Sequence, residues 1–388
     1  MYKVRTMNAI APCGLDILRE ADFAVSESEE APEGLLIRSA KLHDMSFNDG
    51  LLCISRAGIG VDNIPIDRCT EAGIAVFNTP GANAEAVKEL LVCALLLSSR
   101  DVVGGIEWVK SLAGAGDELP ALVEKGKKQF IGPEIAGKKL GVIGLGAIGS
   151  RVANIALRLD MEVYGYDPFL SVQSAWNLSS KVKNCPDLDM LLRSCDYITM
   201  HIHCTDATRH LLNAAAFAKM KPGMRVLNLA RGELVDDEAL LAAMDAGQVA
   251  SYVTDFPNDT IVGHKGVVAF PHLGASTPEA EEKCAEMAAK ELVDYLLNGN
   301  IQNSVNFPTA TLDRLGESRL CLLHRNKPGM LNRFLEKIAA RDINVEHMLN
   351  KARGELAYTI FDTTTALTEE LADEMRAIPG VIRVRLLG

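Results

Sequence analysis

Residues 138–167 have the sequence KKLGVIGLGAIGSRVANIALRLDMEVYGYD, and this stretch decides the fold. A short apolar run leads into Gly144-Leu145-Gly146-Ala147-Ile148-Gly149, and an amphipathic run leads into a second apolar run. Glycines at this spacing between a strand and a helix are typical of a turn that binds a dinucleotide. The first glycine allows the tight turn, the second lets the backbone approach a pyrophosphate, and the third lets the helix pack against the strand.

Asp167 follows the second predicted strand, at the position where such a fold contacts a ribose. A carboxylate there can accept hydrogen bonds from the adenosine ribose and would repel a 2′-phosphate. The motif and Asp167 together therefore predict NAD, rather than NADP, as the cofactor. A structural glycine turn followed by a surface aspartate is the alternative, and the register of the two features makes it the less favoured one.

Short apolar runs alternate with helical runs on both sides of this stretch. The alternation predicts an α/β protein with two Rossmann-like, doubly wound parallel sheets. After residue 316 the order becomes strand, helix, strand, strand, helix, strand, which predicts a ferredoxin-like module. We expect a first domain from residues 1–97 and 278–305, a dinucleotide-binding domain from 98–277, a linker at 306–316 and a C-terminal module from 317–388.

Composition excludes several classes of function. A net charge of −11 at pH 7 argues against nucleic-acid binding, and the longest apolar runs are too short to span a bilayer. The N-terminal residues alternate like a strand and lack the features of a signal peptide. All 9 cysteines lie singly, without a CxxC pair, which favours buried thiols in a reducing cytosol over disulfides or a metal site. We therefore expect a soluble, cytoplasmic protein without a metal.

Two side chains that can do chemistry follow directly after predicted strands. Arg231 follows the strand RVLNLA, and His272 follows GVVAFP. Open α/β sheets bind their ligands at the carboxyl ends of strands. A guanidinium there can hold a carboxylate through two hydrogen bonds, and an imidazole can accept the proton of a hydroxyl group. Each residue alone is more often structural, but together they favour oxidation of a secondary alcohol that carries a carboxylate.

A histidine in this role usually has a carboxylate partner that orients it. Asp255 and Asp259 are the two candidates in the segment Thr254-Asp255-Phe256-Pro257-Asn258-Asp259. Either aspartate could instead belong to a turn.

Taken together, these stretches resemble the D-2-hydroxyacid dehydrogenase family, and within it the D-3-phosphoglycerate dehydrogenases. Segments 56–63, 78–83, 144–167, 230–232 and 271–272 match in the family's order. The resemblance implies NAD-dependent oxidation of 3-phospho-D-glycerate to 3-phosphohydroxypyruvate, the first step of L-serine biosynthesis. One alternative is another acid, such as glyoxylate or hydroxypyruvate. A second is a non-catalytic scaffold that senses NAD, although such a protein would be expected to lack the base or the arginine.

The resemblance also implies individual roles. His272 would be the acid/base, and Arg231 would bind the substrate carboxylate. Counted without a gap from Phe256, Asp259 stands where the family has the glutamate that pairs with the histidine; a slip of one residue places Asp255 near the nicotinamide. The substrate would be held by Arg56, Ala57, Gly58, Asn83 and Arg231. The NAD site would be formed by Gly144, Gly146, Ala147, Ile148, Gly149, Asp167, His203, Ala230, Arg231 and Asp255.

The C-terminal module resembles an ACT domain, a regulatory module that binds amino acids where two copies meet. Segments 324–329 and 342–345 are similar to the serine-sensing version. The resemblance implies that His324, Asn326 and Asn344 bind L-serine as a feedback inhibitor, and that the protein is a homodimer or homotetramer. An oligomerisation module that has lost its ligand is the alternative.

Overall fold

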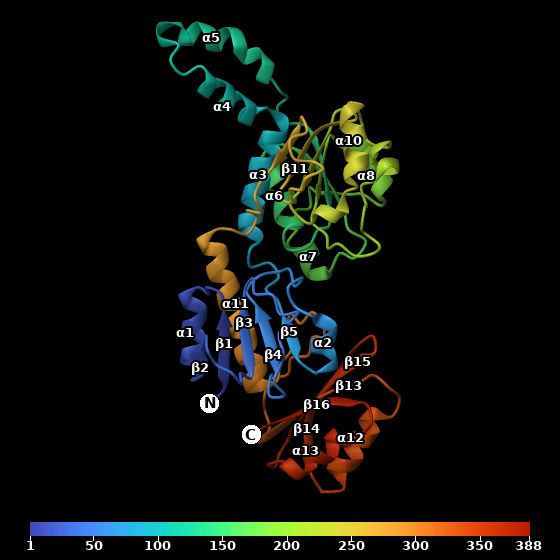
Figure 1. Ribbon diagram of the computed structural model, residues 1–388. Helices are drawn as coiled ribbons and strands as arrows, with labels where there is room; N and C mark the ends of the chain where they lie inside the picture. Colours follow the sequence, from blue (N-terminus) through green and yellow to red (C-terminus); the bar gives the residue numbers. More distant parts are fainter. The chain divides into compact units, whose positions relative to one another are not determined.

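The computed structural model describes residues 1–388, with the exception of the side chain of Gln173. The chain forms two compact units, one of residues 1–82 and 278–388 and the other of residues 83–277 (Figure 1). Each unit is described by itself below.

The first unit begins with a five-stranded parallel sheet in the order β2-β1-β3-β4-β5. This is the flavodoxin-like order of a doubly wound fold. Its elements are β1 (Lys3–Met7), α1 (Pro12–Glu20), β2 (Ala24–Ser26), β3 (Gly34–Ile37), β4 (Cys53–Arg56), α2 (Ile66–Glu71), β5 (Ala75–Phe77) and α11 (Pro278–Asn298). The 21-residue helix α11 packs against α1 and against strands β3 to β5. The chain re-enters the first unit at Pro278, and the buried face of α11 completes the core of that unit.

The C-terminal module is a four-stranded antiparallel sheet in the order β14-β15-β13-β16, with two helices. Its elements are β13 (Ser318–Arg325), α12 (Met330–Ala339), β14 (Val345–Arg353), β15 (Leu356–Thr363), α13 (Glu369–Arg376) and β16 (Val381–Leu387). Both the element order and the strand order are those of a ferredoxin-like fold. Apolar residues of α12 and α13, such as Phe334 and Met375, are fully buried against this sheet.

The carboxyl end of α11 is capped by side chains of the C-terminal module. The last carbonyls of a helix have no partner within the helix and need one when they are buried. Arg385 donates to the carbonyl oxygens of Tyr295 and Leu296 at 2.8 and 2.7 Å. The hydroxyl of Tyr358 donates to the carbonyl of Gly299 at 2.6 Å. One apolar cluster runs from the parallel sheet through α11 into β13, β15 and β16.

A fully buried ion pair reinforces this junction. Arg319 and Asp362 are both 0% exposed, and two guanidinium nitrogens of Arg319 donate to the two carboxylate oxygens at 2.6 and 2.7 Å. The remaining nitrogen, Nη1, donates to the carbonyls of Asn298 and Leu312. The expected linker at 306–316 is therefore held at both ends, since Asn306 and Phe307 are also buried.

The second unit contains a seven-stranded parallel sheet in the order β12-β11-β10-β9-β6-β7-β8. This is a Rossmann order, with the topological switch point between β6 and β9. Its strands are β6 (Lys139–Ile143), β7 (Glu162–Tyr166), β8 (Lys183–Asn184), β9 (Tyr197–Met200), β10 (Met224–Asn228), β11 (Val249–Thr254) and β12 (Val267–Ala269). Its helices are α3 (Ala84–Ser99), α4 (Val102–Ser111), α5 (Leu119–Gly126), α6 (Gly149–Arg158), α7 (Val172–Trp176), α8 (Leu188–Ser194), α9 (Ala214–Phe217) and α10 (Asp237–Asp245).

Helix α3 belongs to this second unit, so the division falls at Asn83 rather than at the expected residue 98. Val87, Leu91 and Leu95 of α3 are buried in the same cluster as Leu140 and Val142 of β6. The sequence of α3 is apolar on nearly every face, which indicates that the helix is buried but does not indicate which unit it packs against.

Helices α4 and α5 form an arm that extends away from the sheet of this unit (Figure 1). Trp108 of α4 and Phe130 pack with ring centroids 5.4 Å apart. A β-carbon at Gly126 of α5 would lie 2.2 Å from the Trp108 ring, so glycine is required for this packing.

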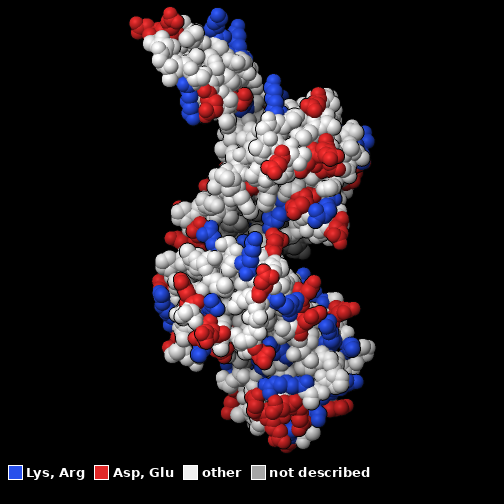
Figure 2. All heavy atoms as spheres, viewed as in Figure 1, with Lys and Arg blue, Asp and Glu red and all other residues white. Residues whose placement is uncertain are grey.

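Acidic and basic side chains are interspersed over the face shown in Figure 2, with acidic ones gathered on the C-terminal module. Helix α13 contributes Glu369 and Glu370 in its first turn, where carboxylates interact favourably with the helix dipole. No helix in the described part of the chain combines the length and the apolar character needed to cross a membrane.

Candidate active site

The glycine loop connects β6 to α6, as the sequence predicts. Gly144 has φ +86°, and a β-carbon there would lie 2.6 Å from the carbonyl oxygen of His201. A β-carbon at Gly149 would lie 1.9 Å from the carbonyl oxygen of Gly144. Packing within the protein therefore requires both glycines. Gly146 differs, because a β-carbon there would meet nothing within 4 Å. Open space above Gly146 fits close approach of a pyrophosphate to the backbone.

Asp167 directly follows β7, and its carboxylate contacts the backbone of the glycine loop. One carboxylate oxygen accepts from the backbone N–H of Leu145 at 2.8 Å, and the other accepts from that of Phe169 at 2.9 Å. An ionised carboxylate has about four acceptor positions, so capacity remains for ribose hydroxyls. Asp167 thus fixes the shape of the glycine loop through its hydrogen bond to Leu145.

Two histidines follow β9, on the other side of the switch point. His203, an expected cofactor contact, is exposed, and its carbonyl accepts from the hydroxyl of Thr208. His201 was not expected in the site. Its Nε2 lies 3.1 Å from the hydroxyl of Thr199, and its buried Nδ1 has no hydrogen-bond partner among the described residues. Burial lowers the pKa of His201 to about 4, so this imidazole is neutral beneath the glycine loop.

Arg231 is held by a buried asparagine at the end of β10. The Asn228 side chain donates to the carbonyl of Arg231 at 2.8 Å and accepts from the N–H of Ala230 at 3.2 Å. The Arg231 guanidinium donates to the carbonyl of Ala230 at 2.7 Å. The turn that carries Arg231 is therefore fixed by hydrogen bonds from the end of its own strand.

His272 lies beyond β12 in a left-handed conformation with φ +50°. Its ring contacts the ring of Phe256, with centroids 4.6 Å apart, and the Cζ of Arg231 lies 5.6 Å from the centroid of the same ring. The two predicted catalytic side chains thus meet on one aromatic ring.

Asp255 lies beneath this group and is 1% exposed. Its Oδ2 accepts from the N–H of Gly274 at 3.2 Å, whereas Oδ1 has no hydrogen-bond partner among the described residues. Burial raises the pKa of Asp255, and the nearby charges of His272 and Arg231 act in the opposite direction. Asp259 is exposed, and the structure shows no contact between it and His272. Of the two candidate partners, the structure brings only Asp255 to the histidine.

The expected substrate loop lies in the first unit, at the end of β4. Nε of Arg56 donates to the carbonyl of Arg38 at 3.0 Å. Gly58 has φ +153°, and a β-carbon there would lie 2.2 Å from the Arg56 guanidinium. The N–H groups of Ala57 and Gly58, expected to bind substrate, donate to the carbonyls of Ile37 and Arg56 instead.

Arg38 directly follows the neighbouring strand β3 and was not anticipated. It forms a 2.6 Å ion pair with Glu281 of α11, and both side chains are partly exposed. Burial raises the pKa of the Cys284 thiol, and the charges of Arg56 and Arg38 oppose that rise, so both guanidinium groups lie near Cys284. The signal in the sequence was an arginine at the carboxyl end of each of two adjacent strands.

Asn83 precedes α3 in the second unit and is 6% exposed. Its carbonyl accepts from the N–H of Val87, and its side-chain oxygen is buried without a hydrogen-bond partner among the described residues.

The expected effector residues do not meet in one copy of the module. Asn326 lies beside Gly354 at one end of the sheet, where Arg325 pairs with Leu356. Asn344 precedes β14 at the other end, where Val345 pairs with Thr363.

His324 is 2% exposed, so it lies inside the module rather than on its surface. Its Nδ1 lies 2.9 Å from the carbonyl of Arg325, and its Nε2 lies 2.8 Å from the hydroxyl of Thr359. Burial lowers the pKa of His324. Both ring nitrogens are occupied inside the module, which leaves none for direct contact with an effector.

A Rossmann sheet with this glycine loop, Asp167, Arg231 and His272 has the features of the coenzyme-binding half of a dehydrogenase. Residues 94–274 match the family model of the D-isomer specific 2-hydroxyacid dehydrogenase, NAD binding domain. The chain belongs to this family.

The chain is similar to D-3-phosphoglycerate dehydrogenases over most of its length. It is 32% identical to that of Bacillus subtilis (92% of this chain and 69% of the relative) and 32% identical to that of Haemophilus influenzae (87% and 81%). It is 35% identical to that of Synechocystis, where the alignment spans 82% of this chain but only 58% of the relative. The chain thus spans less than two thirds of some of the curated relatives that it matches.

Solved structures agree with the fold. An NAD+-bound 3-phosphoglycerate dehydrogenase of Entamoeba histolytica has a TM-score of 0.63 at 26% identity, covering 79% of this chain and 98% of that one. A glyoxylate reductase of Paecilomyes thermophila has a TM-score of 0.66 at 21% identity, covering 78% and 98%. The second likeness concerns the fold alone.

Proposed function

We propose that this protein is an NAD-dependent dehydrogenase that oxidises 3-phospho-D-glycerate to 3-phosphohydroxypyruvate. The observation that carries the proposal is the convergence of His272, Arg231 and Asp255 around Phe256, at the carboxyl ends of β10, β11 and β12. These strands belong to the same sheet as the glycine loop. The identity to D-3-phosphoglycerate dehydrogenases of two bacteria supports the choice of acid.

The side chains of the second unit fit the two tasks of the reaction. Arg231 can hold the substrate carboxylate, which fixes C2 and its hydroxyl group relative to the base. The His272 imidazole can accept the hydroxyl proton as the carbonyl forms, and Asp255 can stabilise the resulting imidazolium. Gly144 to Gly149 and Asp167 would hold NAD, whose nicotinamide ring supplies the acceptor for the hydride that leaves C2.

The first unit would recognise the phosphate. Arg56 is the last residue of β4 and Arg38 directly follows the adjacent β3, and a guanidinium binds phosphate through two parallel hydrogen bonds. Glu281 now pairs with Arg38, so a phosphate would have to compete for that side chain. In the Arg38→Leu variant, kcat/KM should fall more for 3-phosphoglycerate than for an acid without phosphate. An equal loss for both acids would remove Arg38 from phosphate recognition.

A steady-state assay of the purified chain tests the function. We expect NAD-dependent turnover of 3-phosphoglycerate, and kcat/KM well above that for glycerate, lactate and hydroxypyruvate in the matching direction. His272→Gln should lose roughly 10²-fold or more of the activity, the usual scale of general base catalysis. Turnover of only non-phosphorylated acids would replace the substrate but keep the class. No turnover of any 2-hydroxy acid would contradict the class as well.

We propose, further, that the C-terminal module is an ACT domain that binds L-serine between two copies. Its ferredoxin-like fold supports this assignment, as does the opposite placement of Asn326 and Asn344, which a twofold axis would bring together. Strand β14 is an unpaired edge of nine residues and offers a surface for a second copy. Because His324 is enclosed, its role would be to support the loop that carries Asn326 rather than to touch the ligand.

Calorimetric titration with L-serine tests the regulatory proposal. Wild type and the surface control Arg376→Ala should bind serine with equal affinity. Asn344→Ala should bind serine at least roughly tenfold more weakly, because the loss of one hydrogen bond to a charged ligand lowers the affinity by about this factor. Binding that is equal in all three proteins would remove Asn344 from the site. A wild type that does not bind serine would leave an oligomerisation module.

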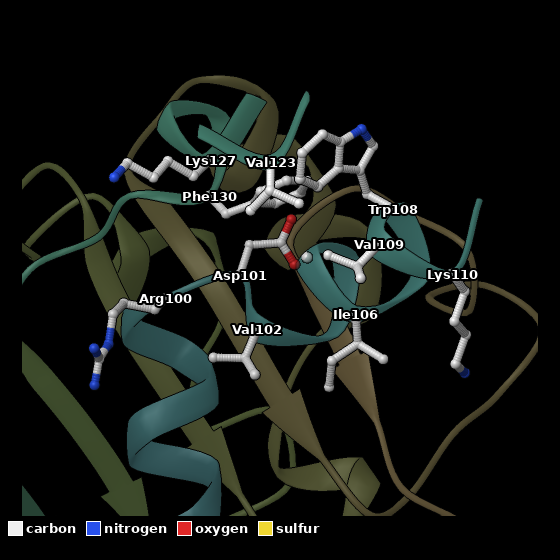
Figure 3. A pocket seen from close by; sticks show the side chains of 11 residues that line it. Arg100, Asp101, Val102, Ile106, Trp108, Val109, Lys110, Val123, Lys127 and Phe130 are labelled. Atoms are coloured by element: carbon white, nitrogen blue, oxygen red, sulfur yellow. The ribbon is translucent and has the colours of Figure 1, made fainter. Parts of the chain in front are cut away.

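We propose a homo-oligomer in which the arm of the second unit contacts another copy. Val102, Val103, Ile106 and Val109 of α4 are between 43% and 50% exposed. A hollow of about 500 Å³ beside them is bounded by Trp108 and Phe130 (Figure 3). Light scattering of the Ile106→Glu variant should show a smaller assembly than that of wild type. A monomeric wild type would contradict the proposal.

A further inference from the structure

The ring of Phe256 lies against Arg231, which is always charged, and against His272, which would become charged during the proposed reaction. Its centroid is 4.6 Å from that of the His272 ring, at an interplanar angle of 48°. The Arg231 guanidinium carbon is 5.6 Å from the same centroid. We infer that Phe256 is a positioning residue whose aromatic face favours the protonated form of His272. This inference rests on the proposed function, in which His272 is the base.

The physical basis is the charge distribution of the ring. The face of an aromatic ring is negative, and it attracts a cation within about 6 Å of the centroid. Both contacts fall within this range. The attraction for His272 grows when the imidazole accepts the substrate proton, since neutral imidazole carries no net charge. The ring therefore stabilises the product of the proton transfer more than the reactant.

Proton and electron movements balance without a further reactant. The O–H bond of the substrate breaks, its proton goes to the imidazole, and its electron pair becomes the second bond of the new carbonyl group. The C2–H bond breaks, and its hydrogen would leave with both bonding electrons as a hydride, for which the coenzyme required by the proposed function would be the acceptor. Phe256 takes no part in bond making.

Charged groups from two other strands act on the same imidazole. Asp255, after β11, interacts electrostatically with both His272 and Arg231, so it attracts an imidazolium, whereas the guanidinium of Arg231, after β10, has the same charge as an imidazolium. Phe256 follows Asp255 directly, and its N–H donates to the hydroxyl of Thr254 at 3.0 Å, so the ring and the carboxylate are oriented by one short segment.

The backbone of His272 adds an independent indication that its position is imposed. A φ of +50° is uncommon for a residue other than glycine, and such conformations persist where the surroundings fix them. The N–H of His272 donates to the carbonyl of Phe270 at 3.0 Å, and Asp255 accepts from the N–H of Gly274. The Phe256 ring supplies the contact to the imidazole itself.

The test is the pH profile of kcat/KM for oxidation, compared across substitutions of this ring. Phe256→Leu keeps an apolar side chain but removes the π face. We expect the acidic limb to move to lower pH by roughly half a unit to one unit, on the scale of a cation–π contact. KM for NAD should stay within about twofold, because the glycine loop is untouched. Phe256→Tyr restores the π face and should return the limb to the wild-type position.

Phe217→Leu is the matched control. Phe217 is 2% exposed in the core of the same unit, among apolar neighbours. This substitution should lower the melting temperature without moving the limb. If Phe256→Leu does not fold, Phe256→Met replaces it in the same comparison.

Two outcomes separate this inference from the function on which it rests. If His272→Gln retains wild-type turnover, the proposed base is wrong, whatever Phe256 does. If His272→Gln is inactive while Phe256→Leu keeps the acidic limb at the wild-type pH, only the role of Phe256 is overturned. A limb that moves equally in Phe256→Leu and Phe256→Tyr would also overturn it.

Discussion

Asp255 and Asp259 have the same side chain, and only their surroundings give them different chemistry. Asp255 is enclosed by Gly274 and by the charges of His272 and Arg231. Asp259 faces solvent four residues later. A carboxylate in water contributes little to a neighbouring cation, whereas an enclosed one contributes strongly.

The two aspartates should therefore respond differently to the same substitution. We expect Asp255→Asn to lower kcat/KM by roughly 10²-fold, because the imidazolium loses its counter-charge. Asp259→Asn should stay within about twofold of wild type. Steady-state kinetics of both variants, with melting curves to confirm folding, make the comparison. A large loss in Asp259→Asn alone would restore Asp259 as the partner.

A second residue-scale prediction concerns Glu291 of α11, which is 7% exposed. Its Oε1 accepts from the side chain of Asn303 at 2.6 Å, and its Oε2 is buried without a hydrogen-bond partner among the described residues. Burial raises the pKa of Glu291 to about 8.

The folded state therefore keeps the Glu291 proton between about pH 4.5 and about pH 8, where the unfolded chain has lost it. The free energy of unfolding should fall as the pH rises through this range and level off above it. Urea titrations at several pH values measure this slope. Glu291→Gln should flatten it and should be more stable than wild type at pH 8. A slope unchanged in Glu291→Gln would show that other groups cause it.

At the scale of elements, the informative junction is the end of α11. Arg385 is 7% exposed and donates to two carbonyls of this helix, while its guanidinium lies 4.5 Å from the centroid of the Tyr295 ring. The helix propensity of α11 and the strand propensity of β16 do not predict this contact, because the contact joins segments about 90 residues apart in the sequence.

Removal of the Arg385 side chain should therefore destabilise the first unit. Arg385→Ala removes the charged donor from both carbonyls, which costs about 2–4 kcal/mol, although the Tyr295 carbonyl keeps the N–H of Gly299 as a donor. Arg376→Ala, which removes an exposed ion-paired arginine of α13, should cost less than about 1 kcal/mol. Urea denaturation compares the two. Equal small losses would show that α11 does not need this cap.

At the scale of the whole molecule, the C-terminal module is part of the core of the first unit. Cys321, Leu323, Tyr358, Ile360 and Leu387 belong to the same buried cluster as Phe77 and Tyr295. The linear order of domains in the sequence suggests an appended module, but the packing makes it a structural component of the first unit.

Deletion of residues 317–388 should thus expose apolar surface on the remaining chain. We expect the truncated protein to lose cooperative unfolding of the first unit and to bind a hydrophobic dye, while the 83–277 unit retains NAD binding. Calorimetry and dye fluorescence measure this. A truncated chain that unfolds as cooperatively as the full chain would show that the module is merely attached.

The sequence by itself determined the parts of this protein that depend on short-range order. The glycine loop, Asp167 and the placing of Arg231 and His272 after strands follow from local spacing, since a strand, a turn and a helix are specified by contiguous residues. The βαββαβ order of the module followed for the same reason.

Only the tertiary structure decided the contacts between distant segments. It moved α3 into the second unit, brought Asp255 rather than Asp259 to His272, placed Phe256 against Arg231, and enclosed His324. It also joined the module to α11 through Arg319 and Arg385. These contacts depend on which buried surfaces fit together. Local sequence patterns do not show how side chains far apart in the sequence will pack, so the contacts became visible only in the folded chain.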